Sequence, residues 1–480
     1  MTEDGVFRKL PTILDGPYVT MVSSDDPTSA DIVWETDESC YGEIITGSAT
    51  YSQDGDTKKH VVRMTGLSPD TDYEYTVRCE ASDGRDTFSN TYTMRTAPAK
   101  GQGTVRFAFA SDSRPSSAPL GDWNRMGVNA HIFSEVVSGA YENDADFFIF
   151  GGDLITGMTT KTEDYILQFK GWKQIVAPFW RSRPVYTGMG NHEGLWNLDA
   201  SFTALDKWPY ETDSGEAVFA AEFYNPSDGP VPSDPRRPTY KENVYSFQYG
   251  STMVISLNNT YWVGGATLGG SPWGYMMADQ LEWLENTMAR ADSDPTVETV
   301  FAFMHSPVFP SMRHAGGAMF QGGDNNMRAY TKNAETGELE PEAMGIIEVR
   351  NRLWKALAGS SKVAAVFTGD EHAYHRTLIT SSTPVGIYPD DDTDGDGVLD
   401  KFSPNPEFTY PVWHITCGGG GAPYVANLES EAVPWEPVRV TSNYGYLLIQ
   451  AEGDKASLEF IGNSVGEVMD QVDDLMEVKK

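Results

Sequence analysis

Residues able to bind a metal ion or move a proton follow five apolar runs of this 480-residue chain. Oxygen and nitrogen donors of Asp, Asn and His are the ligands that cations take in proteins. In open α/β sheets the carboxyl ends of the strands line the ligand crevice, so we expect these side chains to converge. A single Asp after a strand is more often a turn or helix cap, and it is the repetition that indicates a site. The residues are Asp112, Asp153, Asn191, His192, Glu193, His305, Asp370, Glu371 and His372.

The elements that must position these residues follow from the apolar pattern after residue 104. Continuous apolar strands are typical of sheets covered on both faces, and amphipathic segments between them indicate helices. We therefore predict a layered α/β domain over residues 104–480. Its predicted strands are 105–110, 147–150, 185–187, 253–257, 300–304 and 363–368, and its predicted helices are 129–141 and 279–291.

The first hundred residues have a different pattern, with short alternating strands such as 30–36, 40–46 and 72–79. This spacing predicts a small all-β sandwich over residues 16–98, after an N-terminal arm (1–15) and before a linker (99–103). Residues 66–73, with Leu67 six residues before Tyr73, resemble the tyrosine corner of fibronectin type III domains. Cys40 and Cys79 lie on neighbouring predicted strands, and two alternatives stay open: a disulfide, or two small apolar side chains.

Composition excludes some partners. The chain has 69 acidic and 35 basic residues, a net charge of −34, which argues against nucleic acid because phosphate backbones need a basic footprint. No apolar stretch has the ~20 residues that a membrane span needs. The acidic N-terminus lacks the regions of a signal peptide, so the protein is either cytosolic or has lost a leader. We expect a secreted or periplasmic protein, on the fibronectin-like sandwich, the possible disulfide and a calcium-type loop.

The ordered motif series Asp112, Gly152-Asp153, Gly190-Asn191-His192-Glu193, His305 and Gly369-Asp370-Glu371-His372 resembles the calcineurin-like metallophosphoesterase superfamily. The layout is most similar to purple acid phosphatases, which also carry an N-terminal fibronectin-like domain. The resemblance implies a four-layer β-sandwich flanked by helices. It also implies hydrolysis of phosphate esters by a hydroxide that two metal ions activate.

The resemblance assigns roles to individual residues. Asp153 bridges two transition-metal ions, which are Mn, Fe or Zn, and His192 acts as acid or charge stabiliser beside the leaving oxygen. The substrate is a small phosphorylated molecule, with phosphomonoesters favoured. Phosphodiesters, nucleotide anhydrides and a binding protein that has lost turnover stay open as alternatives. The further implied ligands are Asp112 and His372 on the first metal, and Asn191, His305 and Asp370 on the second.

Three residues depart from the family pattern. Thr156 stands where purple acid phosphatases have an iron-binding tyrosine, Arg114 replaces the histidine of an Asp-x-His motif, and Asp370 replaces another histidine. If Arg114 and Asp370 both point inward, the local charge is preserved, and carboxylate for imidazole favours Mn or Fe over two zincs. We assign phosphate clamping to Arg114, with pairing to Asp112 or a surface acid as the alternative. His314 contacts the phosphate or leaving group, or is a surface loop histidine.

A second metal signal lies in the acidic loop 390–402. Oxygen ligands at positions 1, 3, 5 and 9 with glycine at position 6 are typical of an EF-hand calcium loop. Position 12 is Ser403 instead of Glu, so we expect modest affinity, and a solvated acidic loop is the alternative. A calcium-dependent adhesive protein would use this loop together with the sandwich. The four predicted ligands are Asp392, Asp394, Asp396 and Asp400.

Overall fold

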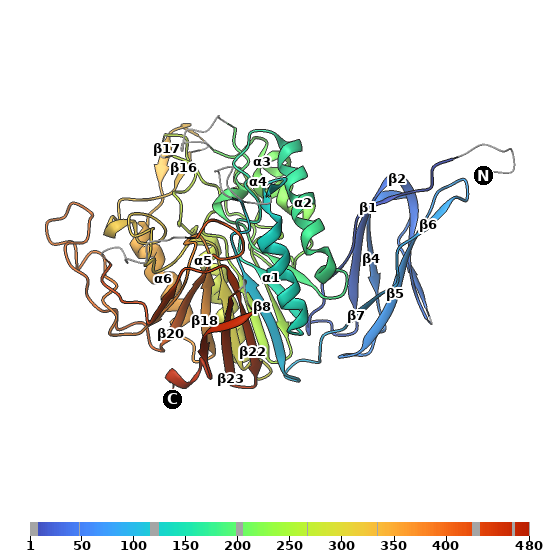
Figure 1. Cartoon of the computed structure of the whole chain (residues 1–480). Coiled ribbons are helices and arrows are strands. Elements are labelled where there is room, and N and C mark those ends of the chain that lie inside the picture. Colours follow the sequence, from blue (N-terminus) through green and yellow to red (C-terminus); the bar gives the residue numbers. More distant parts are fainter. Residues whose placement is uncertain are drawn as a thin grey trace.

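The computed structural model describes residues 8–47, 49–115, 124–197, 205–265, 267–333, 335–424, 433–462 and 466–479, without the side chains of Asn124 and Arg125. The first half of the predicted N-terminal arm lies outside these residues. An all-β unit built from the first hundred residues stands beside a larger layered unit (Figure 1). Within the described part of the chain, no helix is both long and apolar enough to cross a membrane.

The N-terminal unit is a β-sandwich whose two layers share one long strand. β2 (Ala30–Thr46) pairs through its first half with β1 and β4 and through its second half with β3 and β5. The sequence predicted two strands here. The chain does not turn between them because the pairing with β4 shifts register between Glu35 and Cys40, which lets one strand change layers. The remaining strands are β1 (Ile13–Thr20), β3 (Thr50–Ser52), β4 (Thr57–Met64), β5 (Asp72–Glu80), β6 (Asp86–Phe88) and β7 (Tyr92–Arg95).

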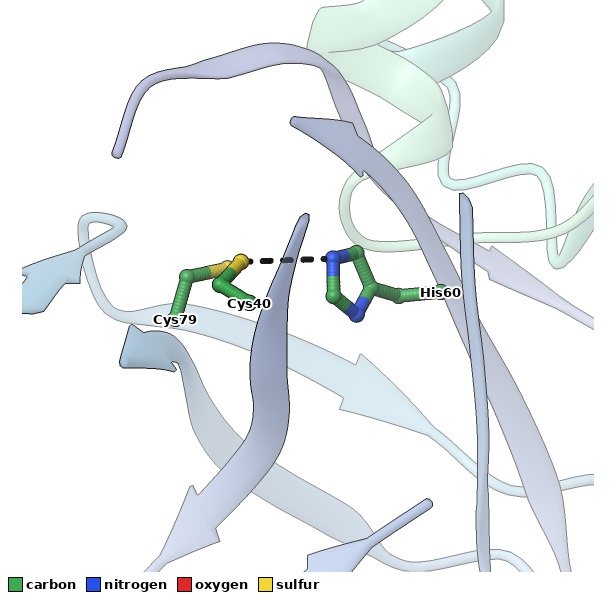
Figure 2. Close-up of side chains that lie close together, drawn as sticks. All are labelled: Cys40, His60 and Cys79. Carbon is green, nitrogen blue, oxygen red and sulfur yellow. Dashed lines mark hydrogen bonds between the residues drawn. The ribbon is translucent and has the colours of Figure 1, made fainter. Parts of the chain in front are cut away.

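The two cysteines of the sandwich lie side by side in its core (Figure 2). β2 and β5 are antiparallel neighbours, as predicted, and Cys40 and Cys79 are both buried free thiols, so the structure contains no disulfide between them. Trp34 Nε1 donates to Cys79 Sγ over 3.0 Å, and Cys40 Sγ lies 3.6 Å from His60 Nε2. His60, which the sequence pattern did not single out, stacks on Trp34.

The larger unit contains two mixed sheets. In the first sheet, in the order β12-β11-β8-β22-β23-β24, the strands β12, β11 and β8 are parallel. In the second, in the order β13-β14-β15-β18-β20-β19-β21, the strands β14, β15, β18 and β20 are parallel. The first sheet contains β8 (Val105–Ala110), β11 (Phe147–Phe150), β12 (Val185–Thr187), β22 (Gly445–Glu452), β23 (Lys455–Gly462) and β24 (Glu467–Val472). The second contains β13 (Tyr245–Tyr249), β14 (Thr252–Ser256), β15 (Thr299–Phe303), β18 (Val363–Thr368), β19 (Tyr374–Ile379), β20 (Val412–Cys417) and β21 (Arg439–Thr441).

The sheets pack face to face between two helical layers. Side chains alternate along each strand, so Phe107 and Phe109 meet Phe301 and Phe367 of the other sheet, with ring centroids 5.2 Å and 5.1 Å apart. Ala108 and its outward-facing neighbours pack on α1 (Ala130–Glu142) and α2 (Thr162–Trp180). The outer face of the second sheet packs on α5 (Ala278–Ser293) and α6 (Ile346–Ala358). This arrangement is the predicted four-layer α/β fold.

Short elements complete the chain between these layers. Most of them lie in the long connections that follow the strands of the first sheet or precede those of the second. They are β9 (Asn124–Arg125), β10 (Val128–Asn129), α3 (Tyr210–Asp213), α4 (Gly215–Glu222), β16 (Tyr330–Lys332), β17 (Leu339–Pro341) and the 3₁₀ turns Asn191–Glu193, Gln321–Gly323 and Glu477–Lys479.

A buried charged group fixes the sandwich to the larger unit. Lys173 Nζ on α2 lies 2.9 Å from Glu222 Oε2 and 3.5 Å from Asp15 Oδ2 of β1, and Lys59 of β4 contacts the other Glu222 oxygen at 3.2 Å. Burial favours the neutral acid, but the charge of Lys173 keeps the pKa of Glu222 below its usual value. These contacts hold the two units in one orientation.

Candidate active site

Carboxyl ends of parallel strands bring the predicted site residues together. Asp112 follows β8, Asp153 follows β11, and the Asn191–Glu193 turn follows β12 in the first sheet. His305 follows β15, and Asp370 follows β18 in the second. Asp112, Asp153 and Asp370 have φ values of 65°, 54° and 68°, in the left-handed region that side chains other than glycine seldom adopt. Strained backbone of this kind is concentrated at functional sites.

His305 lies at the centre of the group and is fully buried. Its Nδ1 lies 3.0 Å from the carbonyl oxygen of Gly151 and donates to it. Its Nε2 lies 3.1 Å from both Asn191 Oδ1 and Asp153 Oδ1, and 4.0 Å from one oxygen each of Asp112 and Asp370. Burial favours the neutral ring, but the charges of Asp153 and Asp112 raise the pKa of His305 well above its usual value. The surroundings of Nε2 therefore favour a positive charge.

The surroundings of Asp112 indicate whether these residues fit a metal ion. Its Oδ2 accepts from the backbone N–H of Asp370 over 3.0 Å, whereas its Oδ1 is buried with no hydrogen-bond donor. Burial, together with the charge of Asp153, raises the pKa of this carboxyl to about 7 against the effect of His305. Ligand atoms of Asp112, Asp153 and His305 all lie within 4.8 Å of one another. Such a buried set with an unpaired oxygen fits one cation.

Arg114 lies on the other side of Asp153. Its Nε is 3.5 Å from Asp153 Oδ2, and its Nη2 donates to His372 Nε2 over 3.1 Å. His372 Nδ1 in turn lies 2.7 Å from the carbonyl oxygen of Pro423. Burial, followed by the charges of Arg114 and Arg313, lowers the pKa of His372 to about 3. Arg114 thus points into the site and pairs with Asp153, and neither alternative partner from the sequence is involved.

Two further histidines border the site. His192 Nε2 lies 3.8 Å from Asp153 Oδ2, and its Nδ1 lies 2.6 Å from the carbonyl oxygen of Thr156. His314 Nε2 lies 3.3 Å from Asp370 Oδ1, so the loop histidine faces the site. The Thr156 hydroxyl donates to the carbonyl oxygen of Gly127. The predicted catalytic and metal-binding residues therefore lie in one cluster. They are Asp112, Arg114, Asp153, Asn191, His192, His305, His314, Asp370 and His372.

Glu193 shapes the first-sheet side of the site, a role that the sequence reasoning did not assign. Its carboxylate accepts from the backbone N–H groups of Gly190 (2.6 Å), Asp153 (2.8 Å) and Leu154 (2.8 Å). Burial and the charge of Asp153 raise its pKa to about 8, against the effect of these donors. Glu193 therefore ties the loop of Asp153 to the loop of Asn191. Its position beside two predicted ligands was the available signal.

Glu371 has the corresponding role on the second-sheet side, and the sequence reasoning missed it as well. Its Oε1 accepts from the backbone N–H groups of Met312 and Arg313, each over 2.8 Å, and of His314 over 3.2 Å. Its Oε2 lies 2.6 Å from His375 Nε2, and both side chains are fully buried. Burial alone would raise the pKa of Glu371, but the hydrogen bond and charge of His375 lower it. Glu371 therefore orders the loop that carries His314.

A cavity of about 540 Å³ opens beside this cluster. Its wall is mainly apolar and aromatic, and a few polar side chains enter it. Volumes of several hundred cubic ångströms are typical of small-molecule sites. The residues that line it include Asn191, Trp196, Trp273 and His314.

The acidic loop 390–402 lies outside the cluster. Oxygens of Asp392, Asp394 and Asp400 lie within 4.8 Å of one another, and Asp396 is not part of that group. The carboxylate of Asp392 accepts from two backbone N–H groups of the loop, and Ser403 donates to Asp391. Calcium binding by this loop stays a prediction.

Comparisons with known proteins match this architecture along the chain. The family model described as calcineurin-like phosphoesterase matches residues 106–374, more than half of the chain. The purple acid phosphatase N-terminal domain model matches residues 17–96, and the iron/zinc purple acid phosphatase-like C-terminal model matches residues 412–471.

Individual relatives are more distant. Two uncharacterised proteins of Mycobacterium tuberculosis, from strains H37Rv and CDC 1551, are 26% identical over 413 residues, 84% of this chain and 66% of their own length. The chain thus spans just under two thirds of these relatives. The purple acid phosphatase from yellow lupin (Lupinus luteus) seeds superposes with a TM-score of 0.61 at 17% identity, over 96% of this chain and 74% of its own. That likeness shows the same fold. The chain belongs to the calcineurin-like phosphoesterase family, with purple acid phosphatase-type domains on both sides of the phosphoesterase domain.

Proposed function

We propose that this protein is a metal-dependent hydrolase of phosphate esters, with phosphomonoesters as the favoured substrates. The observation that carries the proposal is the buried cluster of Asp112, Asp153 and His305 at the strand ends of a calcineurin-like phosphoesterase fold. Asp112 Oδ1 has no donor there, which a bound cation would compensate.

Asp112, Asp153, Asn191 and His305 would hold the cation. A bound cation supplies Lewis-acid chemistry, because it neutralises phosphate oxygens and makes water more acidic. His305 Nδ1 donates to Gly151, which leaves the Nε2 lone pair for the metal. The oxygen-rich ligand set favours Mn or Fe over Zn.

Side chains around the cluster would bind and orient the ester. The guanidinium of Arg114 has planar donors that suit phosphate oxygens, and its side chain is 17% exposed. His192 and His314 border the cluster with side chains 15% and 18% exposed, so both can contact substrate. We assign them to stabilising or protonating the leaving oxygen. Glu193 and Glu371 position these groups through the backbone N–H groups that donate to their carboxylates.

The cavity supports an ester with an organic leaving group. His314, Trp273 and Trp196 line it next to Asn191, so a leaving group that occupies the cavity would have its phosphate near the proposed metal. A cavity of about 540 Å³ also has room for a phosphodiester or a nucleotide, which makes these the second candidates. A binding protein without turnover is less well supported, because every proposed metal ligand is present in one cluster.

Two further parts of the proposal depend on other regions. We propose that calcium binds the Asp392, Asp394 and Asp400 carboxylates and braces the loop. A secreted or periplasmic location rests on the sandwich and this loop, whereas the free thiols of Cys40 and Cys79 do not support it.

The test is hydrolysis of p-nitrophenyl phosphate and of bis-p-nitrophenyl phosphate with manganese, by the wild type and by Asp153→Asn. We expect the monoester to be the better substrate and the variant to lose turnover by roughly a thousandfold, which corresponds to about 4 kcal/mol of transition-state stabilisation. Glu467→Gln, a change at an exposed site in β24, serves as the matched control. Retained turnover in Asp153→Asn, or none in the wild type, would contradict the proposal.

A further inference from the structure

We propose that the guanidinium of Arg114 takes the place of one of the two expected cations, so that the site binds a single transition-metal ion. The inference rests on the proposed function, since it concerns the same site. It replaces the dinuclear centre that the family resemblance implies with one metal ion and one fixed arginine.

The position of Arg114 is the first argument. The resemblance assigns Asp153 and His372 to the first metal, and Arg114 lies between them, 3.5 Å from Asp153 Oδ2 and 3.1 Å from His372 Nε2. Arginine stays protonated in proteins, so its charge repels a cation at this position. The guanidinium already supplies the positive charge that Asp153 Oδ2 needs.

The protonation of His372 is the second argument. Its Nδ1 lies 2.7 Å from the carbonyl oxygen of Pro423 and 3.1 Å from Arg313 Nη1, and the shorter contact, to an oxygen that can only accept, places the ring proton on Nδ1. Its Nε2 lone pair accepts from Arg114 Nη2 and is therefore not available to a metal. Thr156, at the place of the missing tyrosine, uses its hydroxyl on Gly127 and offers no replacement ligand. The first metal position has thus lost two of its expected donors.

The remaining ligands form the third argument, because they converge on one point. The unpaired Asp112 Oδ1 belongs to the set with Asp153 and His305, although the resemblance assigns Asp112 and His305 to different metals. Asn191 Oδ1 lies 3.1 Å from His305 Nε2 and completes this set. His372 Nε2 also lies 3.6 Å from Asp112 Oδ1, but in the described residues no set of three ligand atoms within 4.8 Å of one another includes His372.

Manganese stoichiometry tests the inference without relying on turnover. The full chain is stripped with chelator, reloaded with Mn²⁺ in excess Ca²⁺ so that the Asp392 loop takes up no manganese, and desalted. Mass spectrometry then counts manganese per chain, and electron paramagnetic resonance separates isolated from exchange-coupled ions. We expect one manganese per chain and a six-line spectrum of an isolated ion. Two manganese ions with an exchange-coupled spectrum would overturn the inference.

Variants sharpen the test. Arg114→His removes the guanidinium and adds a donor, so we expect two manganese ions per chain and an exchange-coupled spectrum. Arg313→Ala is the matched control, because Arg313 Nη1 contacts His372 from its Nδ1 side at 3.1 Å, and we expect its count to stay at one. His372→Ala should also keep one ion, whereas His305→Ala should lose it. Loss of manganese in His372→Ala, or a count of one in a folded Arg114→His, would contradict the inference.

The same samples separate this inference from the proposed function. A wild type that hydrolyses p-nitrophenyl phosphate but holds two coupled manganese ions overturns the inference alone. A wild type that holds one manganese ion but hydrolyses neither ester overturns the proposed function alone.

Discussion

Each of the two sheets supplies one half of the site, and each half is organised by a buried glutamate next to a proposed ligand. Glu193 follows the Asn191-His192 pair after β12, and Glu371 lies between Asp370 and His372 after β18. Both carboxylates accept several backbone N–H groups. The difference lies in the partners: Glu371 has a buried histidine 2.6 Å away, whereas Glu193 is held by backbone donors together with its neighbours in the turn.

Because their partners differ, the two glutamates have different roles in the site. Glu193 joins the loops of Asp153 and Asn191, both proposed to hold the cation, so it shapes the metal side. Glu371 reaches across to the loop of Arg313 and His314, so it shapes the substrate side. The first half is thus ordered by hydrogen bonds among ligand loops. In the second half, one oxygen of Glu371 binds backbone N–H groups of a distant segment and the other contacts the nearby His375.

The largest effect is expected from Glu371→Gln. The buried carboxylate contacts His375 and accepts from the backbone N–H groups of the His314 loop, and each buried partner left unsatisfied costs about 1–3 kcal/mol of stability, so the losses at several partners add up. The loop of His314 should also lose its anchor, which raises KM for p-nitrophenyl phosphate more than it changes manganese affinity. Urea unfolding and steady-state kinetics measure both effects, with the exposed Glu467→Gln as control. Unchanged stability would show that the contact between Glu371 and His375 does not stabilise the fold.

Glu193→Gln should have a smaller effect on stability, about 1–3 kcal/mol, because the amide oxygen still accepts while its NH₂ group faces backbone donors. Groups that orient metal ligands typically contribute about 10–100-fold to affinity. We therefore expect weaker manganese binding with a smaller change in KM, measured by manganese titration. If Glu193→Gln raised KM but bound manganese normally, Glu193 would shape the substrate side and not the metal side.

The smallest effect is expected from the acidic loop, where the carboxylates are partly exposed and already accept hydrogen bonds from their own backbone. A calcium concentration tenfold above Kd stabilises the folded state by about 1.4 kcal/mol, which corresponds to a Tm shift of about 1–2 °C for a chain of this length. Asp392→Asn should abolish this shift and leave hydrolysis unchanged. A wild-type Tm that does not respond to calcium would identify a solvated acidic loop.

Much of the fold was readable along the chain. The apolar runs predicted β8, β11 and β18 at their observed limits, because strands covered on both faces contain mostly apolar residues. α2 and α6 were missed. α2 contains Pro178 and is buried around much of its surface, so it lacks the one-sided apolar stripe by which helices are recognised. α6 has such a stripe, so this helix was predictable from its sequence.

The site, like the fold, was predictable from the sequence only in part. Residue type and position after a strand end were sufficient to predict the proposed ligands, because topology brings strand ends together whatever the details of packing. The partners of Arg114 and the roles of Glu193 and Glu371 were not predictable in this way, because each depends on loops that are distant in sequence.

By itself, then, the sequence determined the layered fold and the identity of the residues at the strand ends, since both depend on local pattern. Only the tertiary structure decided that β2 crosses between layers, that Cys40 and Cys79 are free thiols, and that Arg114 lies between Asp153 and His372. These features depend on distances between segments far apart in the chain. Such distances are set by the packing of whole layers, and no local pattern encodes them.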